Sequence, residues 1–178
     1  MQQRKARYTM KKTSEAAVKR ILKGKSNPLD KEGFWFKDNA TGKNGVTDSF
    51  CMVMYDSYTL CVSDPSDAPI NVNASQLFEP FNNQFHEWYN DNRTENILVK
   101  DIIDLQKEAK KNKDEDPNWY QVKRFGICFN INLMRDVCEA LDCKEVGIYY
   151  PANPLEARFY KPIVIIGSTG MGLIMPMR

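Results

Sequence analysis

Apolar residues recur with helical spacing in two stretches, one near each end of the chain. The first runs from Thr13 to Leu22, where Thr13 or Ser14 is the expected N-cap and Gly24 lies just past the end. The second follows Asn130, a residue type that commonly caps helices. Both stretches place apolar residues at positions i, i+1, i+4 and i+5, so each helix should bury one face. The positions expected to be buried are Ala17, Val18, Ile21 and Leu22 in the first helix and Leu133, Met134, Val137, Cys138 and Leu141 in the second.

Strand-like runs follow each of these helices. They are Phe34–Phe36, Gly45–Asp48, Phe50–Tyr55 and Thr59–Val62 after the first helix, and Val146–Tyr150, Phe159–Ile166 and Met171–Met175 after the second. A further helix is expected at Ile97–Lys111 and a short one at Ala74–Glu79. A helix followed by strands thus occurs near both ends, which indicates a duplicated unit. The sequence predicts an α+β fold of two helix-plus-strands units, with both helices on one side of the sheet.

Length and charge set limits on this fold and its partners. The chain has 178 residues, which suits one domain with a real core. We expect a basic, flexible arm at residues 1–10 and a single domain over residues 11–178, with a polar insertion at about 83–120. A net charge of +2 gives no case for a strongly basic nucleic-acid binder. Any such role would have to come from uneven placement of charge.

Cysteine usage and hydropathy bear on the compartment. The five cysteines are odd in number, include no Cys-x-x-Cys pair and lie mostly in apolar runs, so we expect reduced core thiols and a cytoplasmic protein. Met1–Lys12 is polar and basic without an apolar core, unlike a secretory signal. No apolar run approaches the roughly 20 residues that a membrane span needs, so no membrane association is expected.

Three motifs suggest chemistry, and each has a plainer explanation. The stretch Gly167–Gly172 resembles a phosphate loop, but it joins two strands and lacks the lysine, so a hairpin turn is predicted. His86 is the only histidine, which leaves little for a triad or a multi-histidine metal site. The acidic run at residues 114–116 is interpreted as solvated loop charge. We therefore expect no enzyme activity, no cofactor and no metal.

One face of the first helix is basic. It carries Lys12, Lys19, Arg20 and Lys23 opposite the apolar face, with Glu15 as the only acid, at its border. Such a face is commonly just a solvated surface. The alternative is a helix that lies along a phosphate backbone, which would give affinity without base specificity.

The end of the chain resembles a known family. The stretches "FNINLMRDVCEALDCKEVGIYY", "NPLEARFYKPIVII" and "GLIMPMR" resemble the carboxyl-terminal part of the bacterial DNA sliding clamp, the β subunit of DNA polymerase III. The matched positions run in the family's order and cover about a third of the chain. They are Phe129, Asn130, Asp136, Val137, Ala140, Leu141, Glu145, Val146, Met175, Pro176, Met177 and Arg178. Earlier, Thr47 and Asp48 match a clamp Thr-Asp motif, but Ser49, Phe50 and Cys51 replace its Gly-His-Arg.

The resemblance implies a DNA-clamp-like domain, with two helix-plus-strands units related by a pseudo-two-fold axis. In clamps, six such domains close a ring whose helices line a DNA channel, and an apolar pocket near the carboxyl terminus takes short peptides from replication proteins. The resemblance therefore implies duplex DNA, replication proteins with clamp-binding peptides and further copies of the chain as partners. The peptide site that it implies comprises Thr47, Met52, Asn130, Leu133, Leu155, Met175, Pro176, Met177 and Arg178.

The chain also departs from the family. It holds one clamp-type domain where a clamp subunit has three, and the final leucine is missing. The second helix is expected to expose Asn132, Arg135, Asp136 and Glu139, a mixed face rather than a basic one. Two hypotheses stay open. The first is a replication accessory that assembles around or along DNA. The second is a phage or mobile-element interaction module that has the clamp fold without a ring and acts on the host replication machinery.

Overall fold

The computed structural model describes residues 11–56, 70–74, 94–111, 121–122, 127–149 and 162–175. These residues form three helices and ten strands. The helices are α1 (Lys12–Leu22), α3 (Val99–Lys111) and α4 (Ile131–Ala140). The strands are β1 (Phe34–Asp38), β2 (Asn44–Thr47), β3 (Cys51–Tyr55), β4 (Ile70–Val72), β5 (Thr94–Leu98), β6 (Gln121–Val122), β7 (Ile127–Cys128), β8 (Glu145–Tyr149), β9 (Ile163–Gly167) and β10 (Gly170–Ile174).

Eight of the strands form one sheet in the order β4-β1-β2-β3-β10-β9-β8-β5. The inner six strands form two similar groups of three. The meander β1-β2-β3 follows α1, and the meander β8-β9-β10 follows α4. The two meanders meet in the middle of the sheet, where Val53 of β3 lies opposite Gly172 of antiparallel β10. The expected α+β class is therefore confirmed, and a helix followed by three antiparallel strands occurs twice.

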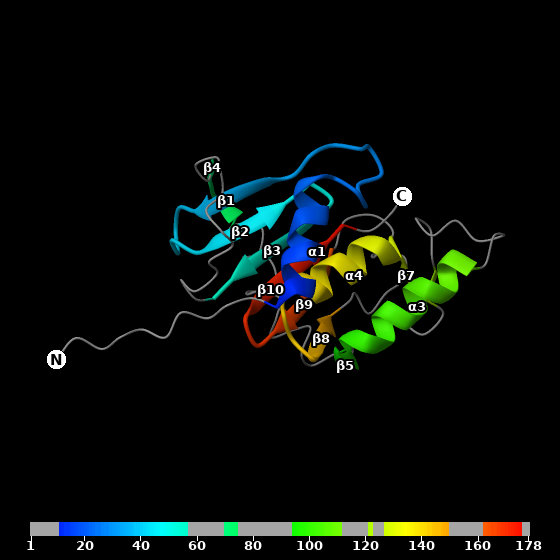
Figure 1. Ribbon diagram of the computed structural model, residues 1–178. Helices are drawn as coiled ribbons and strands as arrows, with labels where there is room; N and C mark the ends of the chain where they lie inside the picture. The colour runs from blue at the N-terminus through cyan, green and yellow to red at the C-terminus, as the bar shows by residue number, and fades with distance from the viewer. Residues whose placement is uncertain are drawn as a thin grey trace.

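All three helices cover the same face of the sheet (Figure 1). The main core lies between them and this face, and it includes Ile21, Val53, Ile102, Val137 and Ile165. A smaller apolar cluster around Phe36, Met52 and Leu173 lies on the opposite face. The helices are thus on one side, as expected for the predicted α+β fold. All the positions that the periodicity predicts to be buried are so except Leu22, which is half-buried.

The two similar helices have different starts. The Asn130 side chain caps α4 by accepting hydrogen bonds from the backbone N–H of Asn132 at 2.9 Å and of Leu133 at 3.3 Å, as predicted. The predicted cap of α1 is wrong, because the N-cap is Lys11, which makes no side-chain capping bond. Ser14 lies inside the first turn instead, where its hydroxyl donates to buried Asp142 at 2.9 Å.

The ends of α1 and α4 are alike. Gly24 follows α1 with φ +58°, and its N–H donates to the carbonyl of Ile21, the arrangement of a glycine-terminated helix. Asp142 takes the corresponding place after α4 with φ +52°. The start of α1 lies beside the end of α4, since Lys11 and Ser14 both contact Asp142. The two helices therefore run antiparallel to each other.

Several boundaries differ from those predicted. The helix expected from Ile97 begins at Val99, because Ile97 and Leu98 pair with β8 instead. Within the predicted insertion, residues 94–111 form β5 and α3, and α3 adds Val99, Ile102 and Ala109 to the main core. The motif at residues 167–172 is the predicted hairpin turn between β9 and β10. The basic arm, the strand at Thr59–Val62, His86, the acidic run and nearly all of the helix at Ala74–Glu79 lie outside the described residues.

Candidate nucleic-acid interface

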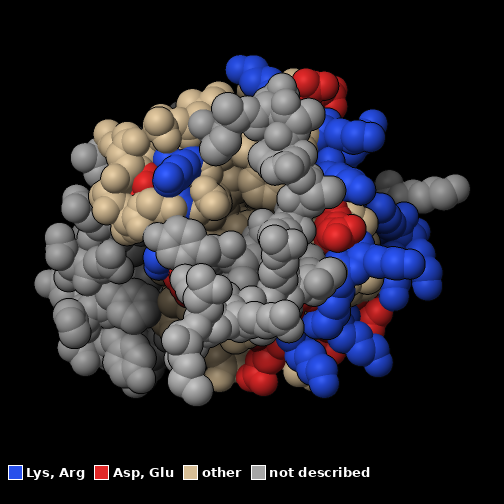
Figure 2. Space-filling view, turned by 60° about the vertical axis from the view of Figure 1, so that its left-hand side comes forward, with Lys and Arg blue, Asp and Glu red and all other residues tan. Residues whose placement is uncertain are grey.

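Three lysines form a row along the solvent face of α1. Lys12, Lys19 and Lys23 follow each other at i, i+7 and i+11, opposite the buried positions Ala17 and Ile21. All three side chains are exposed, and none forms an ion pair with another described residue. Figure 2 shows lysine and arginine side chains gathered along one margin of the molecule, with several acidic groups between them. We call Lys12, Lys19 and Lys23 the α1 lysine row.

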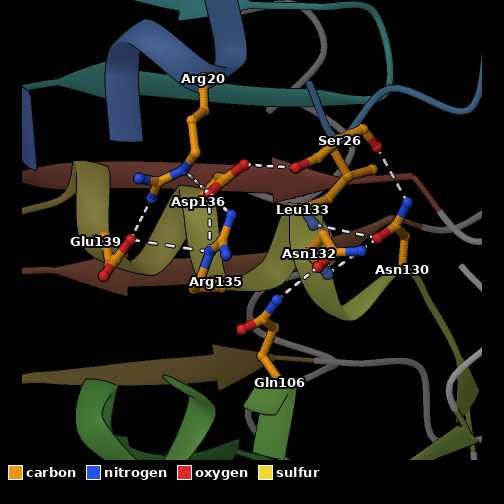
Figure 3. Close-up of polar contacts among 9 residues, drawn as sticks. All are labelled: Arg20, Ser26, Gln106, Asn130, Asn132, Leu133, Arg135, Asp136 and Glu139. Carbon is orange, nitrogen blue, oxygen red and sulfur yellow. Dashed lines mark hydrogen bonds and ion pairs between the residues drawn. The ribbon is translucent and has the colours of Figure 1, made fainter. Parts of the chain in front are cut away.

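Arg20, the fourth predicted DNA contact, points to a different place. Its guanidinium lies against α4, where Nε is 2.6 Å from Asp136 Oδ1 and Nη2 binds Glu139 (Figure 3). The Arg20 side chain is 29% exposed. The structure thus separates Arg20 from the α1 lysine row and makes it part of the contact between α1 and α4.

Asp136 lies at the centre of this polar contact. Its side chain is fully buried, whereas the mixed outer face expected for α4 included it among the exposed residues. That expectation is wrong because Asp136 has partners on three sides. Arg20 and Arg135 contact Oδ1, each at 2.6 Å, and the Ser26 hydroxyl donates to Oδ2 at 2.6 Å (Figure 3). A buried carboxylate with three donors is a stable arrangement.

The remaining outer face of α4 is polar and balanced in charge. Asn132, Arg135 and Glu139 are half-buried, and Arg135 Nε lies 3.9 Å from Glu139 Oε2. Two arginines therefore face two carboxylates between the helices. The positive charge of this helix layer comes from the rims rather than from its middle.

The predicted peptide site is divided between the two faces of the sheet. Thr47 and Met52 are cross-strand partners, and Met52 belongs to the apolar cluster on the face away from the helices. Leu133 is buried in the main core on the helix side, and Asn130 is a fully buried helix cap whose amide donates to Ser26 O at 3.1 Å. These residues do not line one groove.

The end of β10 supplies the exposed part of the predicted site. Met175 is 43% exposed, and its N–H donates to the Phe50 carbonyl at 2.8 Å. Leu155, Pro176, Met177 and Arg178 lie outside the described residues. Of the predicted set, Met175 is therefore the described residue whose side chain reaches solvent.

The Thr-Asp motif forms the turn between β2 and β3. The Thr47 hydroxyl donates to the Cys51 carbonyl at 2.7 Å, and Asp48 Oδ1 accepts from the N–H groups of Phe50 at 2.9 Å and of Cys51 at 2.8 Å. Ser49 between them has φ +74°, a conformation that favours glycine. The motif thus shapes a tight turn, with both of its side chains turned to the backbone.

The buried thiols are held in their protonated state. Burial raises the pKa of Cys51 well above its usual range, and the nearby charge of Asp48 adds to this. Burial likewise raises the pKa of Cys138. Cys51, Cys138 and half-buried Cys143 are free thiols, in agreement with the prediction for these three residues.

Comparison of the chain with family models, with curated proteins and with solved structures gives no match. Among the described residues, no three metal-ligating side chains come together. None of the described helices has the length and apolar character needed to cross a membrane. The topology and the charged helix face are therefore the features of the described residues that bear on function.

Proposed function

We propose that this chain is a non-enzymatic, clamp-fold replication accessory that binds along duplex DNA without sequence specificity. The observation that carries the proposal is the α1 lysine row, three exposed lysines without acidic partners on the solvent side of the helix layer. Lysines placed in this way contact phosphates, which gives affinity to any sequence.

The topology supports the clamp resemblance on which the proposal also depends. A clamp domain has two helix-plus-strands units, and this chain has two helix-plus-meander units that meet at β3 and β10. A detail at one residue agrees with it. Ser49 stands where the clamp motif has glycine, and its φ of +74° is one that glycine adopts without strain.

The experiment is a salt titration of duplex binding. We expect a dissociation constant of about 10⁻⁴–10⁻⁶ M near physiological salt, independent of sequence. Replacing Lys12, Lys19 and Lys23 together by glutamine removes about three phosphate contacts, so the slope of log K against log salt should fall by roughly 2 to 3. Arg20 is left unchanged because it supports the contact with α4.

A matched variant controls for net charge. Lys31, Lys37 and Lys43 lie in the α1–β1 connection, in β1 and in the β1–β2 turn, outside the α1 lysine row, and Lys43 pairs with Asp56 at 2.6 Å. Replacing these three by glutamine changes the charge equally and should leave the salt slope near that of the parent. If both triple variants lower the slope alike, binding is a general effect of charge and the helix face is not the site.

The second candidate is a clamp-fold interaction module that forms no ring. The observation in its favour is the balanced charge in the middle of the helix layer, together with exposed Met175 and Leu29 at the end of the sheet near the β2–β3 turn. Its partners would be replication proteins with clamp-binding peptides. A fluorescent peptide of that kind should then bind at micromolar strength, about −8 kcal/mol. Peptide binding without any duplex binding would favour this candidate.

A further inference from the structure

Helix α3 repeats the lysine spacing of α1. Lys100, Lys107 and Lys111 also follow each other at i, i+7 and i+11, and all three side chains are exposed. We call them the α3 lysine row. They belong to the segment that has no counterpart in the clamp resemblance, so the family's known contacts do not predict them.

The packing of α3 directs this row outward. Its buried positions include Val99, Ile102 and Ala109, which join the main core above the sheet. At 100° per residue, the row lies on the side of the helix away from these positions. Gln106 faces α4 instead, and its amide meets that of Asn132 at 2.8 Å (Figure 3). The α3 lysine row therefore lies on the outer face of the helix layer.

The two lysine rows flank α4. Both α1 and α3 pack against α4, which lies between them in Figure 1. Both also begin beside the end of α4, since Lys11 contacts Asp142, and the Val99 N–H donates to the Lys144 carbonyl at 2.9 Å. From this shared corner the two helices diverge (Figure 1). With neighbouring helices packed at about 8–10 Å, the rows are closest at this corner and lie farther apart toward the carboxyl ends of the helices.

We infer that the α3 lysine row is a second phosphate-binding element, and that the two rows together contact both strands of one duplex. The inference rests on the proposed function and names its ligand more closely. A duplex presents two phosphate backbones separated by a groove about 12 or 6 Å wide. A single strand offers one line of phosphates and engages one row at a time. The face therefore binds duplex DNA in preference to single-stranded DNA.

The acids of α3 are consistent with this arrangement. Asp101 and Glu108 lie to one side of the row, about a quarter turn or more from it around the helix. Asp104 pairs with Lys107 at 3.0 Å, and both side chains are about half-exposed. An exposed pair of this kind contributes little, so a phosphate can replace the carboxylate. Asp104 therefore competes with phosphate for Lys107, and its replacement should strengthen the binding of DNA.

The test compares five proteins by salt titration on one duplex: the parent, the triple glutamine variant of each row, the Lys31, Lys37 and Lys43 control, and Asp104→Asn. Replacing Lys100, Lys107 and Lys111 by glutamine should lower the salt slope by roughly 2 to 3, as the α1 variant does. Asp104→Asn should tighten binding about two- to fivefold. The parent should bind the duplex at least about tenfold more tightly than a single strand of the same length, because it loses one row of contacts on the single strand.

The outcomes separate the inference from the proposed function. If the α1 variant lowers the salt slope and the α3 variant does not, the α3 lysine row does not bind phosphate, and the proposed function stands. Equal binding of duplex and single strand would also overturn the inference. If the parent binds no duplex even at low salt, both fall. Binding to anionic vesicles that exceeds binding to the duplex would show a different polyanion to be the ligand and would overturn both.

Discussion

Asp136 is the residue on which most of the contact between α1 and α4 depends. Sequence patterns place it on the outer side of its helix, because an aspartate at that position suits solvent. Its partners Arg20 and Ser26 lie 116 and 110 residues away along the chain, so no local pattern could show that the carboxylate is buried. For the same reason the sequence suggests Ser14 as a helix cap, whereas its hydroxyl donates to Asp142, 128 residues away.

Removing the buried carboxylate should destabilise the fold. Asp136→Ala leaves Arg20 and Arg135 facing each other without their shared acceptor, at a cost of about 2 to 4 kcal/mol in the free energy of unfolding. Urea denaturation would measure it. Glu139→Ala is the control, because the Glu139 side chain is 16% exposed and lies 3.9 Å from Arg135, so its loss should cost less than that of fully buried Asp136. Equal costs for the two variants would contradict the central role of Asp136.

The buried thiols should make stability depend on alkaline pH. The pKa values of Cys51 and Cys138 are raised in the folded state, chiefly by burial, while the unfolded chain ionises with a pKa of about 8.5. The stabilising contribution of these thiols to the free energy of unfolding is fully present below about pH 8.5. It is lost as the pH rises above that value, because only the unfolded state releases the thiol protons.

The measurement is urea denaturation between about pH 7 and pH 10. Each thiol should remove up to about 1.4 kcal/mol of the free energy of unfolding per pH unit above its unfolded pKa. Cys138→Ala should lower stability at neutral pH because it leaves a small cavity, yet its decline with rising pH should be shallower than that of the parent. Parallel declines in the two proteins would show that Cys138 does not titrate in this way.

At the scale of elements, periodicity predicts the helices well, but it does not predict which strands and helices lie beside each other. The repeated i, i+1, i+4, i+5 pattern identifies the buried faces of α1 and α4, because packing against a sheet requires such a face. The apolar pair Ile97 and Leu98 fits a helix equally well, and only pairing with β8 makes it a strand. Which strands are neighbours, and that α3 packs on α4, depend on contacts distant in sequence.

The packing of α4 onto β10 gives a test at this scale. A Cβ added at Gly172 would lie 2.3 Å from Val137 Cγ1, so Gly172→Ala forces the helix away from the sheet. We expect a loss of about 1 to 3 kcal/mol in the free energy of unfolding. Gly147 in β8 is the matched control, since the nearest atom to its added Cβ is Tyr149 Cε2 at 3.2 Å. That variant should be nearly neutral, and a loss as large as that of Gly172→Ala would place the close contact elsewhere.

At the scale of the whole molecule, the proposed function allows two arrangements, a chain that surrounds DNA or one that lies along it. One domain cannot encircle a duplex, so a ring needs several copies joined at the edges of their sheets. The edge strands of the described sheet are β4 and β5, which have three and five residues and expose Ile70 and Leu98. Among the described residues, each of these short edges exposes one large apolar side chain, which offers little of the roughly 1,000 Å² that a stable interface buries.

We therefore expect a monomer at micromolar concentration that lies along the duplex and is held by its lysine rows alone. Solution mass should correspond to one chain of 20.6 kDa. The decisive measurement is release from closed circular and from linear DNA of the same length after a rise in salt. A closed ring stays on the circle and leaves the linear molecule through its ends, whereas a protein held only by phosphate contacts leaves both at the same rate, because salt weakens those contacts equally on either molecule. Retention on the circle would show that copies close around DNA, and the edges of the sheet would then be the first place to look for the contact between them.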